Sequence, residues 1–233
     1  MNQSPEFAAD FKSKGLPAYL VLDTSGSMKR YEELLNSTLL NIYDTLFTSP
    51  QTSEFIHLSV ISFNTQAHLV TPMTDIEELQ SLPTVTCEGL TNLGPMMQLL
   101  RTRITDDVRA LSEAGTQVLR PVVFLLTDGV PTDQPAGSWQ QDLDELRNPA
   151  WRLYPHIITY GFGAASEAVL QKISTVAAFV AEEGVQNTSD ALSAALTSLL
   201  NSLVASARVR QLQVPEEVKG YRSVPLDFVD GEI

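Results

Sequence analysis

A short apolar run that ends abruptly in polar residues constrains the fold more than any other feature. Residues 18–22 read Ala-Tyr-Leu-Val-Leu, and Asp23-Thr24-Ser25-Gly26-Ser27 follows at once. Such a run is typical of a strand buried on both faces, as at the centre of a parallel sheet. Ligands of open α/β sheets bind at the carboxyl ends of strands. The carboxylate and hydroxyls at alternate positions therefore predict an oxygen-rich site for a hard divalent cation.

Length and charge limit the function classes. The chain has 233 residues, enough for one domain with a substantial core. Its net charge of −13 argues against nucleic acid and against an anionic membrane surface. Cys87 is the only cysteine, which excludes an internal disulfide. The first residues show no export signal and the chain shows no run that we expect to span a bilayer, so we expect a cytoplasmic protein.

Periodicity predicts strands that alternate with helices. Further strands are expected at 55–63, 67–73, 121–126, 156–163 and 177–181, and helices at 28–47, 92–112, 139–153, 166–174 and 189–207, with a short one from Thr74. The three-residue connection 64–66 cannot hold a crossover helix, so its two strands should form an antiparallel pair. We expect a doubly wound, mostly parallel α/β sheet with one antiparallel edge strand and helices on both faces.

Two downstream pieces complete a known pattern. Asp23-x-Ser25-x-Ser27 resembles the first part of the metal-ion-dependent adhesion site (MIDAS) of von Willebrand factor A (VWA) domains. That family also has a Thr in a Gly-containing loop, matched by Thr91 in 89–94, and an Asp at the end of a later buried strand, matched by Asp128. The polar residues 1–16 are expected to form a loose arm. The resemblance implies a VWA domain at 17–207. Residues 208–233 lack a clear period and form a tail that we expect to lie along the domain or to project toward a partner.

The resemblance also implies a role for each matched residue. The hydroxyls of Ser25, Ser27 and Thr91 would bind Mg²⁺ or Mn²⁺ directly, whereas Asp23 and Asp128 would act through water or orient the hydroxyls. A cation with mostly neutral ligands keeps positive charge and can accept a Glu or Asp carboxylate from a partner protein. The expected function is therefore metal-dependent protein binding without catalysis. Another acidic residue, Asp133, is a candidate outer neighbour or a turn or cap residue.

A narrower resemblance concerns cytoplasmic bacterial VWA proteins of the TerY type. It depends on the runs at 21–28 and 125–133, and the chain lacks the cysteine-rich C-terminal module of longer members. This resemblance implies a part in tellurite or stress response, with a protein phosphatase or kinase as partner.

Two other functions stay open at this point. One is a metal-dependent phosphoryl-transfer enzyme, although Ser25 stands where a haloacid-dehalogenase-type phosphatase would have a second Asp. The chain also has no Gly-x-x-x-x-Gly-Lys-Ser/Thr motif and no recognisable Ser-His-Asp arrangement. The other is a structural domain, because hydroxyls and carboxylates at strand ends also satisfy backbone amides.

Overall fold

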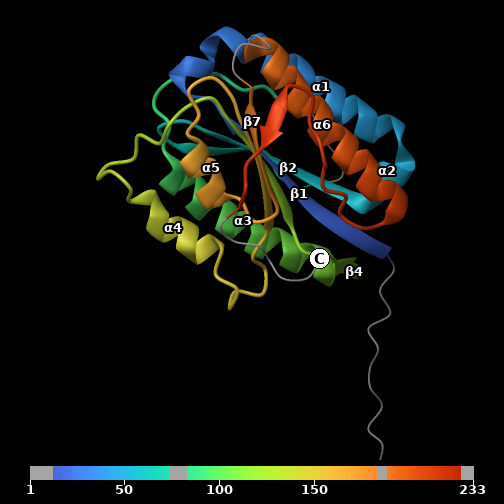
Figure 1. The fold of residues 1–233 in the computed structure, drawn as a ribbon. Coiled ribbons are helices and arrows are strands. Elements are labelled where there is room, and N and C mark those ends of the chain that lie inside the picture. The colour runs from blue at the N-terminus through green and yellow to red at the C-terminus, as the bar shows by residue number, and fades with distance from the viewer. Residues whose placement is uncertain (1–12, 74–82, 183–187, 227–233) are drawn as a thin grey trace, which may run out of the picture.

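A central sheet covered by helices on both faces confirms the predicted fold class (Figure 1). The computed structural model describes residues 13–73, 83–182 and 188–226. Within these residues the sheet has eight strands: β1 (Ser13–Asp23), β2 (Ile56–Phe63), β3 (Ala67–Thr71), β4 (Thr116–Val118), β5 (Val122–Thr127), β6 (His156–Gly161), β7 (Ala177–Ala181) and β8 (Tyr221–Ser223).

Strand β1 lies at the centre of this sheet. The order is β3-β2-β1-β5-β6-β7-β8, and β4 pairs with the start of β1. β1 runs parallel to both β2 and β5. Alternate side chains enter opposite cores, since Tyr19 and Val21 belong to one cluster and Leu20 and Leu22 to the other. An uninterrupted apolar run therefore suits this position, because both faces of the strand are covered.

The helices divide between the two faces. Figure 1 shows α1, α2 and α6 along one side of the sheet and α3 and α4 along the other. A 3-10 helix, η1, directly precedes α1, and a short helix, α5, follows β6. The bounds of all these helices are η1 (Gly26–Tyr31), α1 (Glu32–Thr48), α2 (Pro50–Phe55), α3 (Leu93–Glu113), α4 (Trp139–Leu146), α5 (Glu167–Ile173) and α6 (Thr188–Val209).

Several element boundaries differ from the sequence expectations. β1 begins at Ser13 because residues 13–15 pair with the unforeseen strand β4, so this stretch belongs to the sheet and not to a polar arm. A short helix that the sequence analysis did not predict, α2, begins at Pro50, whose fixed φ suits a first turn. The helix expected from Thr74 lies outside the described residues.

Both edges of the sheet are antiparallel. The predicted β2–β3 pair is confirmed. At the other edge, β8 from the segment 208–233 pairs antiparallel with β7, so this part of the tail lies along the domain, which is one of the two placements expected for it. Strand β8 was not predicted from the sequence, because three residues are too few to show an alternation of apolar and polar side chains.

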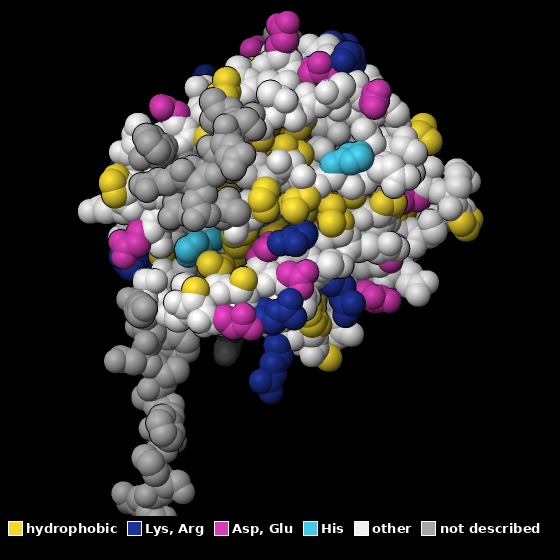
Figure 2. Space-filling view, turned by 180° about the vertical axis from the view of Figure 1, so that it is seen from behind, with side chains coloured by type: hydrophobic (Ala, Val, Ile, Leu, Met, Phe, Trp, Pro, Cys, Tyr) yellow, Lys and Arg dark blue, Asp and Glu magenta, His cyan; other side chains and the backbone are white. Residues whose placement is uncertain are grey.

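Helix α6 is the only described helix that is long and apolar enough to cross a membrane by length and composition. One of its faces is buried in the core, through residues that include Leu192, Leu196, Leu199 and Leu203. A core helix meets the same criterion, and the packing of α6 accounts for its composition. On the face drawn in Figure 2, acidic and basic side chains are interspersed around a band of hydrophobic ones.

Candidate metal centre

The centre forms where β1 and β5 end side by side. Leu22 is paired in register with Leu126, so Asp23 and Asp128 follow neighbouring strands at the same edge of the sheet. Both carboxyl side chains are buried, Asp23 completely. Parallel pairing thus brings together two acidic residues that are far apart in the sequence.

The hydroxyls after β1 reach the carboxylate after β5. Ser27 Oγ donates to Asp128 Oδ1 over 2.7 Å and lies 3.1 Å from Ser25 Oγ. The backbone N–H of Ser25 donates to Asp23 Oδ1 over 2.9 Å. Four of the five predicted residues therefore form one hydrogen-bonded group.

Thr127 joins this group, although sequence reasoning missed it. Its Oγ1 donates to Asp23 Oδ2 over 2.6 Å, so both carboxylate oxygens of Asp23 accept bonds from the chain. This arrangement fixes the orientation of Asp23. The sequence did contain a signal for this role. Thr127 is the last residue of the buried strand β5 and carries a hydroxyl directly before Asp128.

The fifth predicted residue, Thr91, lies beside the group. The N–H of Thr91 donates to Thr132 Oγ1 over 2.9 Å, and the N–H of Thr132 donates to the Thr91 carbonyl over 2.8 Å. A Cβ atom built on Gly129 would lie 3.4 Å from Thr91 Oγ1. The hydroxyl of Thr91 therefore lies close to the loop that leaves Asp128.

Backbone bonds attach the Thr91 loop to the turn after β1. Gly26 N–H donates to the Gly89 carbonyl over 3.0 Å, and Glu88 N–H donates to the Thr24 carbonyl over 2.8 Å. Gly89 has a φ of 74°, a conformation that favours glycine. These backbone bonds hold together the two loops that carry the hydroxyls.

Asp133 caps α3. Its Oδ2 accepts the N–H of Leu93 over 2.9 Å and its Oδ1 that of Gly94 over 2.7 Å. The carboxylate satisfies two first-turn N–H groups, which suits the helix dipole. Asn92, the residue directly before α3, makes no side-chain cap bond. Asp133 was a candidate outer neighbour of the centre or a turn or cap residue, and the structure supports the cap. This cap anchors α3, the helix that follows Thr91.

The electrostatics follow from burial. Burial raises the pKa of the Asp23 carboxyl, although bonds from Ser25 and Thr127 act in the opposite direction. Burial likewise raises the pKa of Asp128, opposed by the Ser27 hydrogen bond and the charge of Arg30. A divalent cation beside the two carboxyls would lower both pKa values, because an opposite charge favours the ionised form.

The donor set consists of oxygens. Among the described residues, no three His, Cys, Asp or Glu side chains gather in a group that could hold a metal ion, so a centre here depends on hydroxyls as well as carboxylates. Hydroxyl and carboxylate oxygens suit hard cations such as Mg²⁺ and Mn²⁺ better than soft ones. The residues present therefore fit the cation that the sequence predicted.

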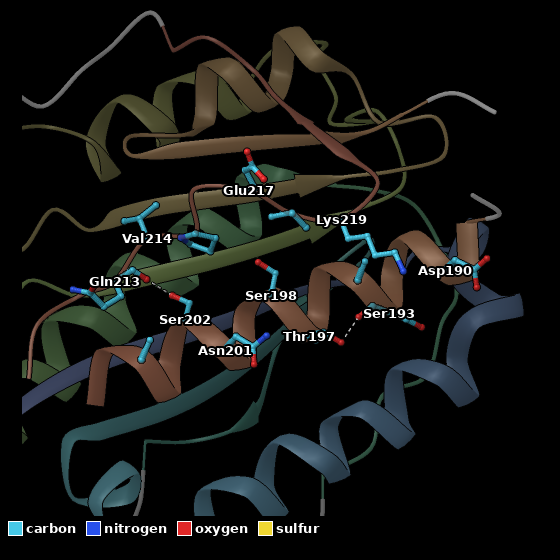
Figure 3. Close-up of a pocket in the computed structure, with 14 residues that line it drawn as sticks. Asp190, Ser193, Thr197, Ser198, Asn201, Ser202, Gln213, Val214, Glu217 and Lys219 are labelled. Carbon is cyan, nitrogen blue, oxygen red and sulfur yellow. Dashed lines mark hydrogen bonds between the residues drawn. The ribbon is translucent and has the colours of Figure 1, made fainter. Parts of the chain in front are cut away.

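A hollow lies elsewhere on the molecule, between α6 and residues 213–219 (Figure 3). This α6 groove has a volume of about 690 Å³ and contains none of the predicted site residues. Two of its hydroxyls donate to backbone carbonyls. Thr197 Oγ1 donates to the Ser193 carbonyl, and Ser202 Oγ donates to the Gln213 carbonyl. The groove also contains the carboxylates of Asp190 and Glu217.

The family assignment follows from the sequence match. The model of the von Willebrand factor type A domain matches residues 19–194, most of the chain and all of the centre. The chain belongs to the VWA family. VWA domains generally mediate protein–protein interaction. No protein of curated function matches the sequence.

Solved VWA structures share the fold at low identity. Proximal thread matrix protein 1 from the mussel byssus has a TM-score of 0.54 and 17% identity, over 84% of this chain and 46% of that one. A von Willebrand factor type A structure from Catenulispora acidiphila has a TM-score of 0.53 and 14% identity, over 82% and 43%. The pilus adhesin SpaC from Lactobacillus rhamnosus GG has a TM-score of 0.60 and 14% identity, over 82% and 30%. This VWA chain spans less than half of each of those proteins.

Proposed function

We propose that this VWA chain is a metal-dependent protein-binding module that captures an acidic side chain of a partner. The observation that carries the proposal is the 2.7 Å bond from Ser27 Oγ to Asp128 Oδ1. It joins hydroxyls that follow β1 to a carboxylate that follows β5, with Ser25 Oγ in contact. Oxygen ligands of this kind suit Mg²⁺ or Mn²⁺.

The contacts support a division of roles within the centre. Asp23 accepts bonds on both oxygens, from Ser25 N–H and Thr127 Oγ1, and so acts as a positioning residue. The hydroxyls of Ser25, Ser27 and Thr91 are the direct ligands, and Asp128 orients Ser27. When bound, the cation supplies an electrophilic position that a partner carboxylate can occupy. The mostly neutral direct ligands leave enough positive charge for that contact.

Related proteins support a divalent cation at this place. A form of proximal thread matrix protein 1 carries a zinc-occupied MIDAS motif, with a TM-score of 0.55 and 15% identity over 82% of this chain. For this chain we propose Mg²⁺ or Mn²⁺, because all its donors are oxygens.

The narrower parts of the proposal rest on the TerY-type resemblance. They are a cytoplasmic location, a part in tellurite or stress response, and a protein phosphatase or kinase as partner. The chain itself binds without catalysis in this proposal. Phosphatase turnover by the purified chain that is lost in Ser25→Ala would contradict it.

Thermal unfolding with added metal tests the centre directly. A cation at about 100 times its dissociation constant should stabilise the fold by roughly 2.7 kcal/mol. At roughly 2–4 °C per kcal/mol, the midpoint should rise by about 5–10 °C with Mg²⁺ or Mn²⁺. We expect a saturable rise in the wild type and none in Asp23→Ala. Asp190→Ala, which removes an exposed carboxylate from the α6 groove, is the matched control and should keep the rise.

The opposite results are equally informative. No rise in the wild type at millimolar metal would contradict a cation site that forms without the partner. A rise that survives in Asp23→Ala but disappears in Asp190→Ala would place the cation in the α6 groove instead.

A further inference from the structure

Two large hydrophobic side chains are exposed beside the metal centre. Leu90 is 52% exposed and Val130 is 50% exposed. Elsewhere in the described part of the chain, the exposed large hydrophobic residues are Leu40 on α1 and Val209 on α6. Single exposed apolar side chains are ordinary on protein surfaces, whereas apolar side chains grouped at one place mark binding surfaces.

The loops that carry Leu90 and Val130 adjoin each other. Thr91 and Thr132 exchange two hydrogen bonds, of 2.9 and 2.8 Å. A Cβ atom on Gly129 would come within 3.4 Å of Thr91 Oγ1. Leu90 directly precedes the first of these residues, and Val130 directly follows Gly129. The two side chains therefore flank one junction, next to a hydroxyl that we assign to the metal.

Leu90 is held in place although its side chain is exposed. Its N–H donates to Thr65 Oγ1 over 3.0 Å. The preceding Gly89 accepts the N–H of Gly26 through its carbonyl, over 3.0 Å. An apolar group on an ordered backbone loses little further entropy when a partner covers it.

The negative net charge of the chain is unfavourable for an acidic partner, so the apolar side chains can contribute affinity that charge does not. With a net charge of −13, the chain repels an acidic partner at long range. This repulsion is screened beyond about 8 Å at physiological salt, so short-range contacts have to supply the affinity. Apolar contact next to the metal adds affinity independently of charge.

We propose that Leu90 and Val130 form an apolar shoulder of the metal centre, and that the partner presents its carboxylate with an apolar side chain beside it. The inference rests on the proposed function, because the shoulder acts only on a ligand that the metal already holds. It assigns specificity to these two residues, whereas the metal supplies the contact to the carboxylate.

Two small acids separate these contributions. The full chain is loaded with Mn²⁺ and titrated with acetate or with 4-methylpentanoate, which has the same carboxylate and a branched apolar tail. Affinity is measured from the paramagnetic relaxation of the acid protons. Burial of part of the tail should make 4-methylpentanoate bind about three- to tenfold more tightly than acetate. In the double variant Leu90→Ser/Val130→Ser, the two acids should bind within about twofold of each other, at the affinity of acetate.

Controls keep failure of the shoulder distinct from failure of the centre. Leu40→Ser removes an equally hydrophobic exposed side chain from α1 and should keep the preference. The double variant should keep the wild-type thermal shift with Mn²⁺, which shows that its centre is intact. Equal affinity of the wild type for both acids overturns the shoulder and leaves the proposed function standing. A preference that survives in the double variant also overturns the shoulder. No metal-dependent binding of either acid overturns carboxylate capture itself, and the shoulder with it.

Discussion

The metal centre and the α6 groove both contain hydroxyl side chains, but these hydroxyls contact different groups. At the centre, Ser27 Oγ donates to the carboxylate of Asp128. In the groove, Thr197 and Ser202 donate to the neutral backbone carbonyls of Ser193 and Gln213. A cation gains most where negative charge and further oxygen lone pairs converge. Hydroxyls bonded to a carboxylate, as at the centre, should therefore suit a cation better than hydroxyls bonded to backbone carbonyls, although the groove also contains Asp190 and Glu217.

The largest expected difference between the two regions is in thiol reactivity. Cys87 is buried beside the metal centre, and burial raises the pKa of its thiol to about 12. Ser198 lies half-buried in the groove, so a thiol in its place should have a pKa closer to the ordinary value near 8.5 than that of Cys87. At pH 8, Ser198→Cys should therefore add a labelling phase roughly a thousand times faster than that of Cys87.

Ellman's reagent, followed by absorbance, measures both phases. The wild type supplies the slow phase alone, and both thiols should react at similar rates in denaturant. Rapid labelling of Cys87 in the native wild type would contradict the closed packing of the loop that leads to Thr91.

The next effect distinguishes two aspartates at helix starts. Asp133 accepts two buried N–H groups of α3, whereas Asp190 is exposed in the first turn of α6. Asp133→Ala leaves those N–H groups without the carboxylate and should cost about 2 kcal/mol of unfolding free energy. Its melting midpoint should fall by roughly 4–8 °C. The midpoint of Asp190→Ala should fall by less, because a carboxylate exposed to water contributes less at a helix start than one that accepts two buried N–H groups.

Calorimetry without metal measures the melting midpoints of Asp133→Ala and Asp190→Ala. Equal midpoints would show that the Asp133 cap contributes no more than an exposed carboxylate. Both variants should keep a thermal shift with Mg²⁺, because neither aspartate is a proposed ligand.

The same comparison explains which features were predictable from the sequence. The apolar runs of β1 and β5 end in Asp23 and Asp128, and parallel pairing of buried strands brings such ends together. The alternation of strands and helices predicted the sheet for the same reason. These features depend on local pattern and on a general rule of topology.

Features that depend on long-range contacts were not predictable. Thr127 orients Asp23 across 104 positions, and Asp133 caps α3 from 40 positions away. Strands β4 and β8 have three residues each, too few to show a period. The α6 groove likewise arises only where residues 213–219 pass over the helix.

A pair of serine deletions tests the role of the hydroxyls. Ser27→Ala removes a proposed ligand and should weaken metal affinity about tenfold or more. Ser202→Ala removes a hydroxyl of the groove and should leave metal affinity unchanged, while it lowers stability by about 1 kcal/mol through the lost bond to Gln213. Titration of the thermal midpoint with Mn²⁺ measures both quantities. Equal metal affinity in the two variants would remove Ser27 from the ligand set.

The smallest effect is expected at Thr197, on the exposed side of α6. Its hydroxyl bonds only within the helix, to the Ser193 carbonyl over 2.8 Å. Alanine is a better helix former than threonine, so Thr197→Ala should raise stability by up to about 0.5 kcal/mol, with the metal shift unchanged. Chemical denaturation with and without Mg²⁺ resolves such a change against the wild type. A loss above about 1 kcal/mol would mean that groove hydroxyls stabilise more than their own helix. A reduced metal shift would link the groove to the centre and end the contrast between the two regions.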